Sequence, residues 1–424
     1  MTTARETCDV AVIGGGPAGS AAGSQLARAG LRVTIFEKEK FPRFCIGESL
    51  LPHGNDLLKE IGIWEKMEAA GFLRKYGAEF TTGDQSRLHR LWFGQNLGSA
   101  HEYTYQVERA AFDQLLLDHA RESGCRVHEQ TRVTSLENPD TEDMTLHGLG
   151  PDGPRLLDTR WVIDASGRNS FAGSRVGLRR TVTQKVRRVA IYGHFSGVTR
   201  NSGRAEGHIT IVRLNGGWFW IIPLAGDRTS VGLVLPTDRA RTSHDRDLQD
   251  IFQEAVESAP AIRERLRKAE PLTPLRATGD YSWKFSSFAT RRILLTGDAA
   301  GFVDPIFSSG VMLALKSGMR AATLLQHADK AMRPLKNSER TAYTREVTRW
   351  MNHYSRLIRS FYDRAGFEVF MSPQPVLHIP GSVARLVGGD TSPSWADRLR
   401  LRAFQAICRA QRLLPIAPAI PSLR

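Results

Sequence analysis

The chain has 424 residues, 41% of them hydrophobic and 24% charged, and a formal net charge of +14, which suits a globular protein of two or three packed layers. Its longest apolar runs, such as residues 217–224, fall short of the roughly 20 residues that a membrane span requires, and no basic-then-apolar secretory leader is visible. The four scattered cysteines, in no metal-binding spacing, predict reduced thiols, no bound metal and a cytoplasmic location.

The first predicted elements form one compact unit. An apolar strand over residues 8–13 runs into a glycine-rich turn over 14–19, a helix is expected over 20–29, and a second strand over 31–36 ends at Glu37. A strand–turn–helix–strand unit of this length is typical of dinucleotide-binding folds.

The glycines of the turn have separate purposes. Gly14 makes the tight turn, Gly16 lets a pyrophosphate approach the backbone, and Gly19 lets helix and strand pack closely. The N–H groups at the start of the helix can then bind phosphate, and the Glu37 carboxylate can bind a ribose hydroxyl. The unit does not by itself distinguish NAD from FAD.

Further elements of the same sheet follow at wide intervals. Residues 107–113 open an amphipathic helix, a strand is expected near 125–133, and residues 161–168 form a strand that ends in a polar turn. Residues 292–298 form another buried strand, which ends in Gly297-Asp298. Strands that return to one nucleotide-binding sheet from such separate places imply a discontinuous domain.

Between residues 175 and 285, short alternating runs predict an antiparallel sheet. From about residue 311 the pattern is helical, with Pro- and Gly-rich breaks at 372–393 and 415–421. The predicted fold is therefore α/β, a GxGxxG Rossmann-like domain with an inserted antiparallel β-sheet domain and a C-terminal helical region. The predicted boundaries are 1–174 with 286–320 for the discontinuous nucleotide-binding domain, 175–285 for the inserted domain and 321–424 for the helical region.

The positive charge is concentrated near the C-terminus. Between Arg320 and Arg424 there are 17 Lys and Arg against 7 Asp and Glu. Such a basic face attracts acidic partners over about 8–10 Å at moderate salt, and without a zinc finger or an RNA-binding motif nucleic acid is not expected. A solvated helical surface and a docking site for an acidic carrier protein both stay open. The aromatic residues of this region have two interpretations, lining of a substrate chamber and helix core. Their spacing favours helix core, so no site role is assigned to Phe361, Tyr362, Phe367 and Phe370.

Several of these motifs together resemble the flavoproteins related to para-hydroxybenzoate hydroxylase. The resemblance rests on the opening unit, Arg109, the turn at 164–167 and Gly297-Asp298, and it spans nearly all of the first 320 residues. It implies an FAD cofactor, with Asp298 at its ribityl or pyrophosphate region and Arg109 along it. For Arg109, a surface position at the start of a helix is the alternative.

Within that class, three further segments resemble the flavin-dependent halogenases. Residues 41–52 (FPRFCIGESLLP) are close to the family's cofactor-side loop, residues 218–223 (WFWIIP) match its WxWxIP signature, and residues 74–78 (RKYGA) contain its lysine position. The resemblance implies halogenation of an aromatic substrate with reduced FAD, O2 and chloride or bromide. No second dinucleotide fingerprint is present, which agrees with FADH2 supplied by a separate flavin reductase.

By this resemblance Lys75, Trp218 and Trp220 are the catalytic residues. The two tryptophans lie between flavin and substrate, and Lys75 lies between the two chambers, where it meets hypohalous acid. The lysine either polarises that oxidant as an ammonium or reacts with it to give a haloamine, and the sequence leaves both open. The alternatives are an aromatic core strand for the tryptophans, whose period of two suits a strand, and a solvated lysine beside Arg74.

The halide site is expected in the loop over residues 306–310, before a helix whose free N–H groups can bind an anion. The resemblance implies that the amides at Ser309 and Gly310 contact the halide. Phe307 stands where the tryptophan halogenases have a glutamate, and this departure resembles the branch that acts on pyrroles and phenols. Many of those substrates are tethered to carrier proteins, so the expected substrate is an electron-rich aromatic, free or bound to an acyl or peptidyl carrier protein.

The resemblance thus implies a complete site. Its predicted cofactor-binding residues are Gly14, Gly16, Pro17, Ala18, Gly19, Glu37, Arg43, Ile46, Gly47, Glu48, Ser49, Arg109, Val133, Asp298, Pro305 and Gly310. Other enzymes on the same fold stay open as alternatives, namely an FAD-dependent aromatic monooxygenase or a geranylgeranyl-reductase-like oxidoreductase. A third alternative is a catalytically silent flavoprotein that binds a carrier protein, against which the intact Lys75, Trp218 and Trp220 argue.

Overall fold

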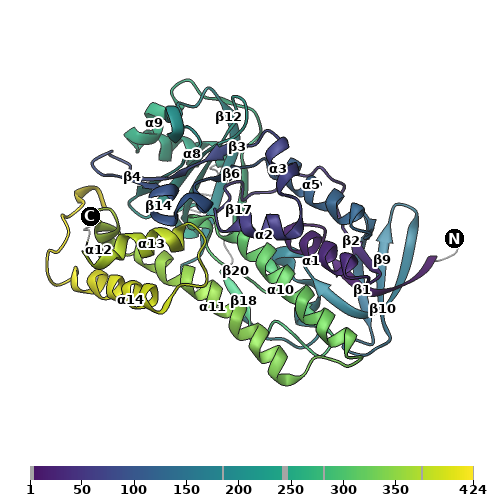
Figure 1. Cartoon of the computed structure of the whole chain (residues 1–424). Coiled ribbons are helices and arrows are strands. Elements are labelled where there is room, and N and C mark those ends of the chain that lie inside the picture. Colours follow the sequence, from purple (N-terminus) through teal and green to yellow (C-terminus); the bar gives the residue numbers. More distant parts are fainter. Residues whose placement is uncertain (1–3, 184–185, 241–246, 280–281, 374–375, 424) are drawn as a thin grey trace.

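The computed structural model of the chain describes residues 4–183, 186–240, 247–279, 282–373 and 376–423 (Figure 1). The described residues form two large β-sheets, two small sheets and a set of helices, which confirms the predicted α/β class. The two long helices α10 (Gly310–Lys330) and α11 (Asn337–Tyr362) run together along one side of the molecule (Figure 1).

The first large sheet is the one expected to bind the nucleotide. Its strand order is β7-β2-β1-β10-β9-β8, with β19 also paired to β10. The central pairs β2–β1, β1–β10 and β10–β19 are parallel, while β8 and β9 extend the sheet in antiparallel fashion. The strands are β1 Ala4–Ile13, β2 Val33–Phe36, β7 Arg126–His128, β8 Arg132–Glu137, β9 Met144–Gly150, β10 Gly153–Asp164 and β19 Ile293–Leu295. The strand β19 therefore returns to this sheet from a distant part of the chain.

Helix α1 (Pro17–Arg28) follows β1 and packs against α5 (Arg109–Glu122) and α10. A Cβ atom at Gly318 in α10 would lie 2.4 Å from the carbonyl oxygen of Ala18, so glycine there allows the two helices to approach closely. The helix α1 begins at Pro17, earlier than the expected residue 20. Proline suits the first position of a helix because a backbone N–H at that position would have no partner within the helix, so nothing is lost when proline lacks it.

The second large sheet has the order β16-β12-β15-β14-β13-β4-β5, with β17 also paired to β12. The four strands expected between residues 190 and 235 are all present and antiparallel, whereas β4 joins β13 in parallel. The strands are β4 Gly77–Thr82, β5 Leu88–Trp92, β12 Arg188–Ser196, β13 Ile209–Leu214, β14 Gly217–Pro223, β15 Thr229–Pro236, β16 Glu270–Pro271 and β17 Arg276–Gly279. Strands from the N-terminal part of the chain thus complete a sheet built mainly from residues 188–279. The domain boundaries drawn from the sequence stay a prediction.

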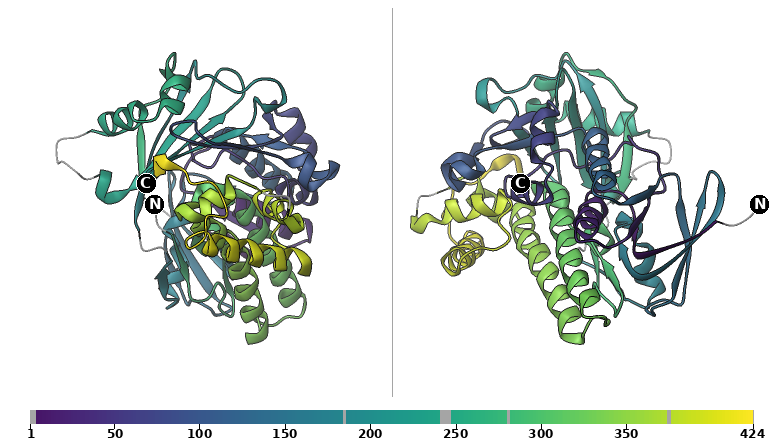
Figure 2. Two further views of the ribbon diagram at one scale, coloured as in Figure 1. Left: turned by 90° about the vertical axis from the view of Figure 1, so that its left-hand side faces the viewer. Right: turned by 45° about the vertical axis from the view of Figure 1, so that its right-hand side comes forward.

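The C-terminal helices gather on one side of the molecule, next to the second sheet (Figures 1 and 2). Their apolar side chains share one core with β4, β13 and β14, and this core includes Trp218, Phe307, Phe361, Phe367 and Phe370. The C-terminal helices are α11, α12 Arg364–Phe370, α13 Ile379–Val387 and α14 Trp395–Ala410. The other helices of four or more residues are α2 Gly54–Ile61, α3 Trp64–Ala69, α4 Phe93–Leu97, α6 Phe171–Arg175, α7 Thr237–Ala240, α8 Leu248–Glu257 and α9 Pro260–Leu266.

Two sequence predictions of local structure were wrong in detail. The single strand expected near 125–133 is two strands, β7 and β8, because the chain turns between them at Gln130, whose φ is +52°. The break expected over 372–393 contains α13, whose proline lies in its first turn, where proline is tolerated.

Among the described residues, no helix is long and apolar enough to cross a membrane. All four cysteines are free, as expected from their spacing, and three of them, Cys8, Cys125 and Cys408, are buried.

Candidate active site

The turn between β1 and α1 leaves no room for a side chain at two of its glycines. Gly14 has a φ of +102°, and a Cβ atom there would lie 2.4 Å from the carbonyl oxygen of Ala165. A Cβ atom at Gly19 would lie 1.9 Å from the carbonyl oxygen of Gly14. Both distances are far shorter than van der Waals contact, so only glycine permits this packing. The start of α1 is thereby held tightly against the end of β1.

A cavity of about 1220 Å³ opens between this turn, the loop over residues 43–49 and the second sheet. Of the predicted cofactor-binding and catalytic residues, those that line it are Gly14, Gly16, Pro17, Ala18, Glu37, Arg43, Ile46, Gly47, Glu48, Ser49, Arg109, Val133, Trp218, Trp220, Asp298, Pro305 and Gly310. Three other predicted residues are not part of the lining. Gly19 packs under the turn, Lys75 lies behind Ser49, and Ser309 is buried just before α10.

Arg109 is a buried residue of the cavity wall, so the alternative of a surface arginine is wrong. Its Nε and Nη2 donate to the two carboxylate oxygens of Asp113 at 2.8 and 2.9 Å, and its Nη1 donates to the carbonyl oxygen of Ile46 at 2.7 Å. Arg43 Nη1 lies 3.2 Å from the same carboxylate. Asp113 thus holds two guanidinium groups at the cavity. Through Arg43 and through the bond from Arg109 to Ile46, the loop over 43–49 is linked to α5.

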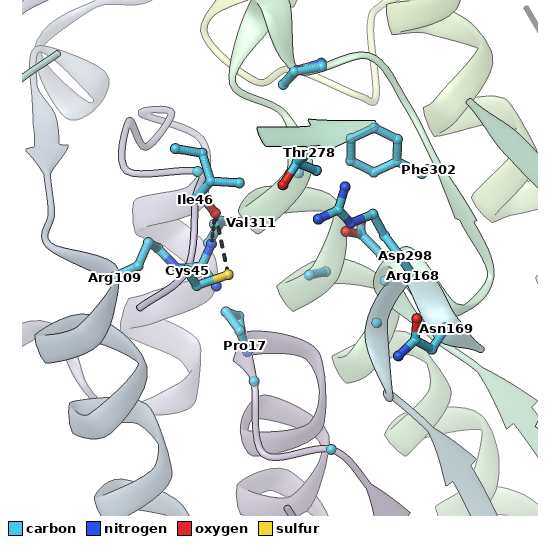
Figure 3. Close-up of a pocket in the computed structure, with 18 of the residues that line it drawn as sticks. Pro17, Cys45, Ile46, Arg109, Arg168, Asn169, Thr278, Asp298, Phe302 and Val311 are labelled. Atoms are coloured by element: carbon cyan, nitrogen blue, oxygen red, sulfur yellow. Dashed lines mark hydrogen bonds between the residues drawn. The ribbon is translucent and has the colours of Figure 1, made fainter. Parts of the chain in front are cut away.

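Figure 3 shows Arg109, Cys45 and Ile46 on one side of the cavity, with Arg168, Asn169, Asp298 and Phe302 on the other. Enclosure by the protein raises the pKa of Asp298 to about 6, although the positive charges of Arg168 and Arg109 act to lower it. A carboxyl group at this position can accept hydrogen bonds from hydroxyl groups of a ligand. The residue lines the cavity, and its contact with the cofactor stays a prediction.

The Glu37 carboxylate accepts hydrogen bonds from two backbone N–H groups. Its Oε2 accepts from the N–H of Gly15 at 2.8 Å and its Oε1 accepts from the N–H of Glu39 at 2.9 Å. The side chain is buried at the end of β2 and lines the cavity. A carboxylate has further acceptor capacity, so binding of a ribose hydroxyl stays a prediction.

Lys75, the last residue of β3 (Leu73–Lys75), is only 1% exposed, so the alternative of a solvated lysine is wrong. Its Nζ donates to Ser49 Oγ at 2.9 Å and to the carbonyl oxygen of Leu50 at 2.9 Å, and it lies 5.3 Å from the centre of the Phe93 ring. Burial lowers the pKa of Lys75 to about 7. Burial therefore favours the neutral amine more than in a lysine exposed to water.

Trp218 and Trp220 lie on one face of β14 with their ring centres 5.8 Å apart, and both line the cavity. A Cβ atom at Gly232 on the neighbouring strand would lie 2.1 Å from the Trp220 ring, so this glycine makes the space for that indole. Trp220 Nε1 donates to Ser230 Oγ at 3.1 Å. The pair belongs to the hydrophobic core, as the interpretation of an aromatic core strand expects, and it also lines the cavity. Its position between flavin and substrate stays a prediction.

The loop over 306–310 leads directly into α10, a helix of 21 residues. Asp304, two residues before the loop, accepts a hydrogen bond from the N–H of Ile306 at 3.2 Å, and Ser308 has a φ of +55°. Ser309 is the residue before the helix, and a Cβ atom at Gly310 would meet nothing within 4 Å. The first N–H groups of a helix have no partner within it, so this loop has the form that an anion site requires.

Phe307 is surrounded by aromatic rings. Its ring centre lies 6.2 Å from that of Phe80, 5.9 Å from Phe361 and 6.3 Å from Phe370. No carboxylate is among these neighbours. The C-terminal helices that were expected to be plain core therefore contact the predicted halide loop.

The sequence did not single out a buried pair beside the cavity. The Glu48 Oε1 and His194 Nε2 atoms are 2.6 Å apart, and both side chains are buried. The two residues are far apart in the chain, and only the second sheet brings β12 next to the loop over 43–49. No sequence pattern over a short window signals such a pair.

The structure also brings together His53, Asp56 and His101, whose possible ligand atoms all lie within 4.8 Å of one another. His101 Nε2 and Asp56 Oδ2 are 2.7 Å apart, and the two imidazole rings stack with their centres 4.1 Å apart. The hydrogen bond and the stacking account for this arrangement without an ion. That the protein binds no metal stays a prediction.

Comparison with known proteins gives a consistent result. A family model described as "FAD binding domain" matches residues 7–350. The chain is 34% identical over 337 residues to the 1H-pyrrole-2-carbonyl-[peptidyl-carrier protein] chlorinase of Pseudomonas fluorescens, a match that covers 74% of each chain. It is 34% identical over 324 residues to the corresponding brominase of Pseudoalteromonas luteoviolacea, covering 76% of this chain and 77% of the relative. The solved structure of the flavin-dependent brominase Bmp2 is similar with a TM-score of 0.84 and 28% identity, over 96% of this chain and 100% of the other.

Proposed function

The chain belongs to the flavin-dependent halogenases, and on that premise we propose that its cavity holds FAD and that Lys75 transfers halogen to an electron-rich aromatic substrate. The position of Lys75 carries this proposal: its amine is buried and hydrogen-bonded to the loop that lines the cavity. Among the described residues Lys75 forms no ion pair, so burial of its charge is not compensated. An uncompensated buried lysine beside a cavity is typical of a functional site.

The residues of the cavity fit FAD. The tight glycine turn exposes the backbone at the start of α1, where a pyrophosphate can accept its N–H groups. Arg109 and Arg43 would lie along the cofactor, and Asp298 and Glu37 would accept from its hydroxyl groups. When bound in its reduced form, FAD supplies the two electrons with which O2 and a proton convert a halide ion into hypohalous acid and water.

We infer that the neutral amine of Lys75 is the form that reacts. Its two N–H groups can donate to Ser49 Oγ and Leu50 O, which leaves the lone pair free. The N–X bond forms as the O–X bond of hypohalous acid breaks, and the oxygen leaves as water with one amine proton. The aromatic carbon then takes the halogen, and the proton that it loses returns to the amine. The lowered pKa supports this step because a nucleophilic amine must be unprotonated.

The remaining predicted residues have supporting roles in this proposal. Trp218 and Trp220 would keep the substrate away from the flavin, since they form a continuous part of the cavity wall. The halide would contact the amides of Ser309 and Gly310 at the start of α10. A halide held there would lie next to the cavity, because Gly310 and Pro305 line it.

For the substrate we propose a pyrrole or a phenol. The position of Phe307 lacks the glutamate of the tryptophan halogenases, and its neighbours are aromatic rings. Electron-rich rings need less help from a base than a benzenoid carbon of indole does. The names of two relatives, pyrrole-2-carbonyl carrier-protein chlorinase and brominase, support a pyrrole attached to a carrier protein.

The outer face of α14 is suited to dock an acidic carrier protein. Trp395 is 77% exposed and Leu399 is 58% exposed, and Arg398, Arg402 and Arg409 are exposed on the same helix. The one acidic residue of α14 is buried and paired with arginines, so this face presents positive charge only. A surface of exposed apolar side chains surrounded by arginines fits an acidic protein partner.

Charge reversal on α14 tests the carrier. The double variant Arg402→Glu/Arg409→Glu is expected to weaken binding of a pyrrole-loaded carrier protein on the order of 10-fold or more, and to flatten its salt dependence. The control Arg267→Glu/Lys268→Glu makes the same charge change at the end of α9, which lies at the top of Figure 1, away from α14 at the lower left, and should bind as the wild type does. Equal affinities for both variants and the wild type would exclude this docking face.

The halogenase reaction itself can be tested without the natural substrate. Protein loaded with FADH2, which we propose a separate flavin reductase supplies in a cytoplasmic setting, is mixed with O2 and either bromide, chloride or no halide. Hypohalous acid is captured by a β-diketone trap, and halogenated trap is expected only when halide is present. Oxidation of FADH2 with no halogenated trap at any halide concentration would favour a monooxygenase or a reductase on this fold.

A further inference from the structure

The last residue of α11, Tyr362, touches the active site through its hydroxyl group. Trp218 Nε1 donates to the Tyr362 hydroxyl oxygen at 2.8 Å, and the same hydroxyl donates to Asp304 Oδ2 at 2.9 Å. The other Asp304 oxygen accepts from Ile306 N–H at 3.2 Å. One phenol thus links the Trp-x-Trp motif to Asp304, which in turn holds Ile306, the first residue of the loop predicted to bind halide.

The Tyr362 ring is itself fixed from several sides. The guanidinium carbon of Arg188 lies 3.6 Å from the centre of the ring, and Arg213 Nη2 donates to the backbone oxygen of Tyr362 at 2.9 Å. Burial, together with the negative charge of Asp304, raises the pKa of the phenol well above its usual value. The hydroxyl therefore keeps its proton for Asp304 and offers its oxygen to Trp218.

The hydrogen bond matters because Trp218 has a single polar atom. The side chain is only 1% exposed, and Tyr362 is the acceptor for its indole N–H. Without that acceptor the N–H would stay buried and unpaired, which favours rotation or displacement of the ring. Trp218, Asp304 and Arg188 all line the cavity, so a displaced indole would alter the wall that faces the oxidant.

We propose that Tyr362 is a positioning residue of this halogenase, which holds Trp218 and the Asp304 end of the halide loop in a single arrangement so that hypohalous acid reaches Lys75 instead of escaping. The inference rests on the proposed function, and it makes the C-terminal helical region part of the active site. Tyr362 lies beyond residues 7–350, the part of the chain that matches the FAD binding domain. The sequence placed it among the aromatic residues expected in a helix core and assigned it no site role.

The first test is independent of flavin and activity. The chain has eight tryptophans, so protein labelled with ¹⁵N at the indole nitrogen gives one NMR resonance for each, and Trp218→Phe identifies that of Trp218 by its loss. In Tyr362→Phe, which removes only the hydroxyl, the Trp218 resonance is expected to move to lower proton frequency. The control is Tyr354→Phe on the same helix, whose buried hydroxyl has no hydrogen-bond partner among the described residues. It should leave the Trp218 resonance in place.

The second test measures what becomes of the oxidant. With pyrrole-loaded carrier protein and a hypohalite trap both present, Tyr362→Phe is expected to lower the ratio of halogenated substrate to halogenated trap by about 2- to 12-fold, the range that loss of one such hydrogen bond corresponds to. Consumption of FADH2 should change by less than twofold in the same samples, since Tyr362 is not itself among the residues that line the cavity. The Tyr354→Phe control should keep the wild-type ratio.

The two readouts separate the ways in which this inference could fail. An unmoved Trp218 resonance in Tyr362→Phe overturns the positioning role, and so does an unchanged ratio of substrate to trap. A wild-type protein that produces no halogenated trap overturns the proposed function instead, while the resonance still reports whether Tyr362 holds the indole. A shifted resonance together with a lowered ratio supports the proposal.

Discussion

The Lys75→Met variant is expected to lose halogenation by on the order of 10²- to 10⁴-fold, the contribution of one well-placed acid, base or hydrogen-bonding group, while it still binds FAD and oxidises FADH2. Methionine keeps much of the length of the side chain and removes only its amine. The flavin contacts proposed above involve other residues, so oxidation of FADH2 should continue. The hypohalous acid that forms should then halogenate the trap instead of the substrate. Halogenated substrate and halogenated trap are measured in the same reaction.

The variant should stay folded, because Lys75 is buried with no ion pair among the described residues and methionine suits an apolar position. Thermal melting and retention of FAD on gel filtration check this. Lys330→Met serves as a control, since Lys330 is exposed at the end of α10 and lies outside the cavity lining. Wild-type yields of halogenated substrate from Lys75→Met would remove Lys75 from the reaction.

The pH profile of halogen transfer then tells which form of Lys75 acts. Burial lowers its pKa to about 7, so the proton leaves as the pH rises through this value. If the amine is the nucleophile, the single-turnover rate of transfer should rise with pH through about 7 and level off above it. An ammonium that acts only as a hydrogen-bond donor gives the opposite slope, a rate that falls over the same interval. Lys75→Met should show neither.

Replacing Gly19 with alanine is expected to release FAD and to destabilise the fold by about 1–3 kcal/mol, the usual cost of overpacking. The new Cβ atom would lie 1.9 Å from the carbonyl oxygen of Gly14 and 3.1 Å from Val12 Cγ1. Backbone atoms cannot rotate away as a flexible side chain can, so α1 must move off β1. The N–H groups at the start of α1 would then leave the position in which we propose that they bind the pyrophosphate.

The FAD content after gel filtration and the midpoint of thermal unfolding measure this effect. Gly381→Ala is the matched control, because a Cβ atom at that position in α13 meets nothing within 4 Å. It should retain FAD and gain roughly 0.5–1 kcal/mol of stability from alanine's better helix propensity. Full FAD retention by Gly19→Ala would mean that the turn tolerates a shift of α1 and that its packing is not what holds the cofactor.

The N-terminal nucleotide-binding unit could be predicted from the sequence because everything that forms it is close in the chain. The strand before the turn, the glycines and the helix after it lie within one short segment, and each glycine answers a local steric demand. The Trp-x-Trp motif and the lysine position could be found for the same reason, as short patterns at fixed spacing. The boundaries of single elements were harder to predict: the turn at Gln130 divides the one strand that was expected near 125–133 into two.

The surroundings of the catalytic candidates could not be predicted in this way. Nothing in residues 74–78 says that Lys75 is buried against Phe93 and bonded to Ser49, since strand pairing brings those groups together. The strand β4 pairs with β13, which lies far from it in the sequence. A periodic pattern identifies a strand but does not identify the strand with which it pairs. Burial is a property of the whole packed molecule, so the lowered pKa of Lys75 follows from the tertiary structure.

The sequence by itself thus determined the cofactor fold and the family and predicted a short list of candidate site residues, because these depend on local sterics and fixed spacings. The tertiary structure alone decided that Trp218, Tyr362 and Asp304 form one hydrogen-bonded chain, that Arg109 is buried, and that α14 exposes apolar side chains among arginines. These features join segments far apart in the chain. The hydrogen-bonded chain arises from the packing of the C-terminal helices on the second sheet, since a polar group that is enclosed there with apolar surface needs a hydrogen-bond partner. Arg109 is buried because α5 and the loop over 43–49 meet at Asp113.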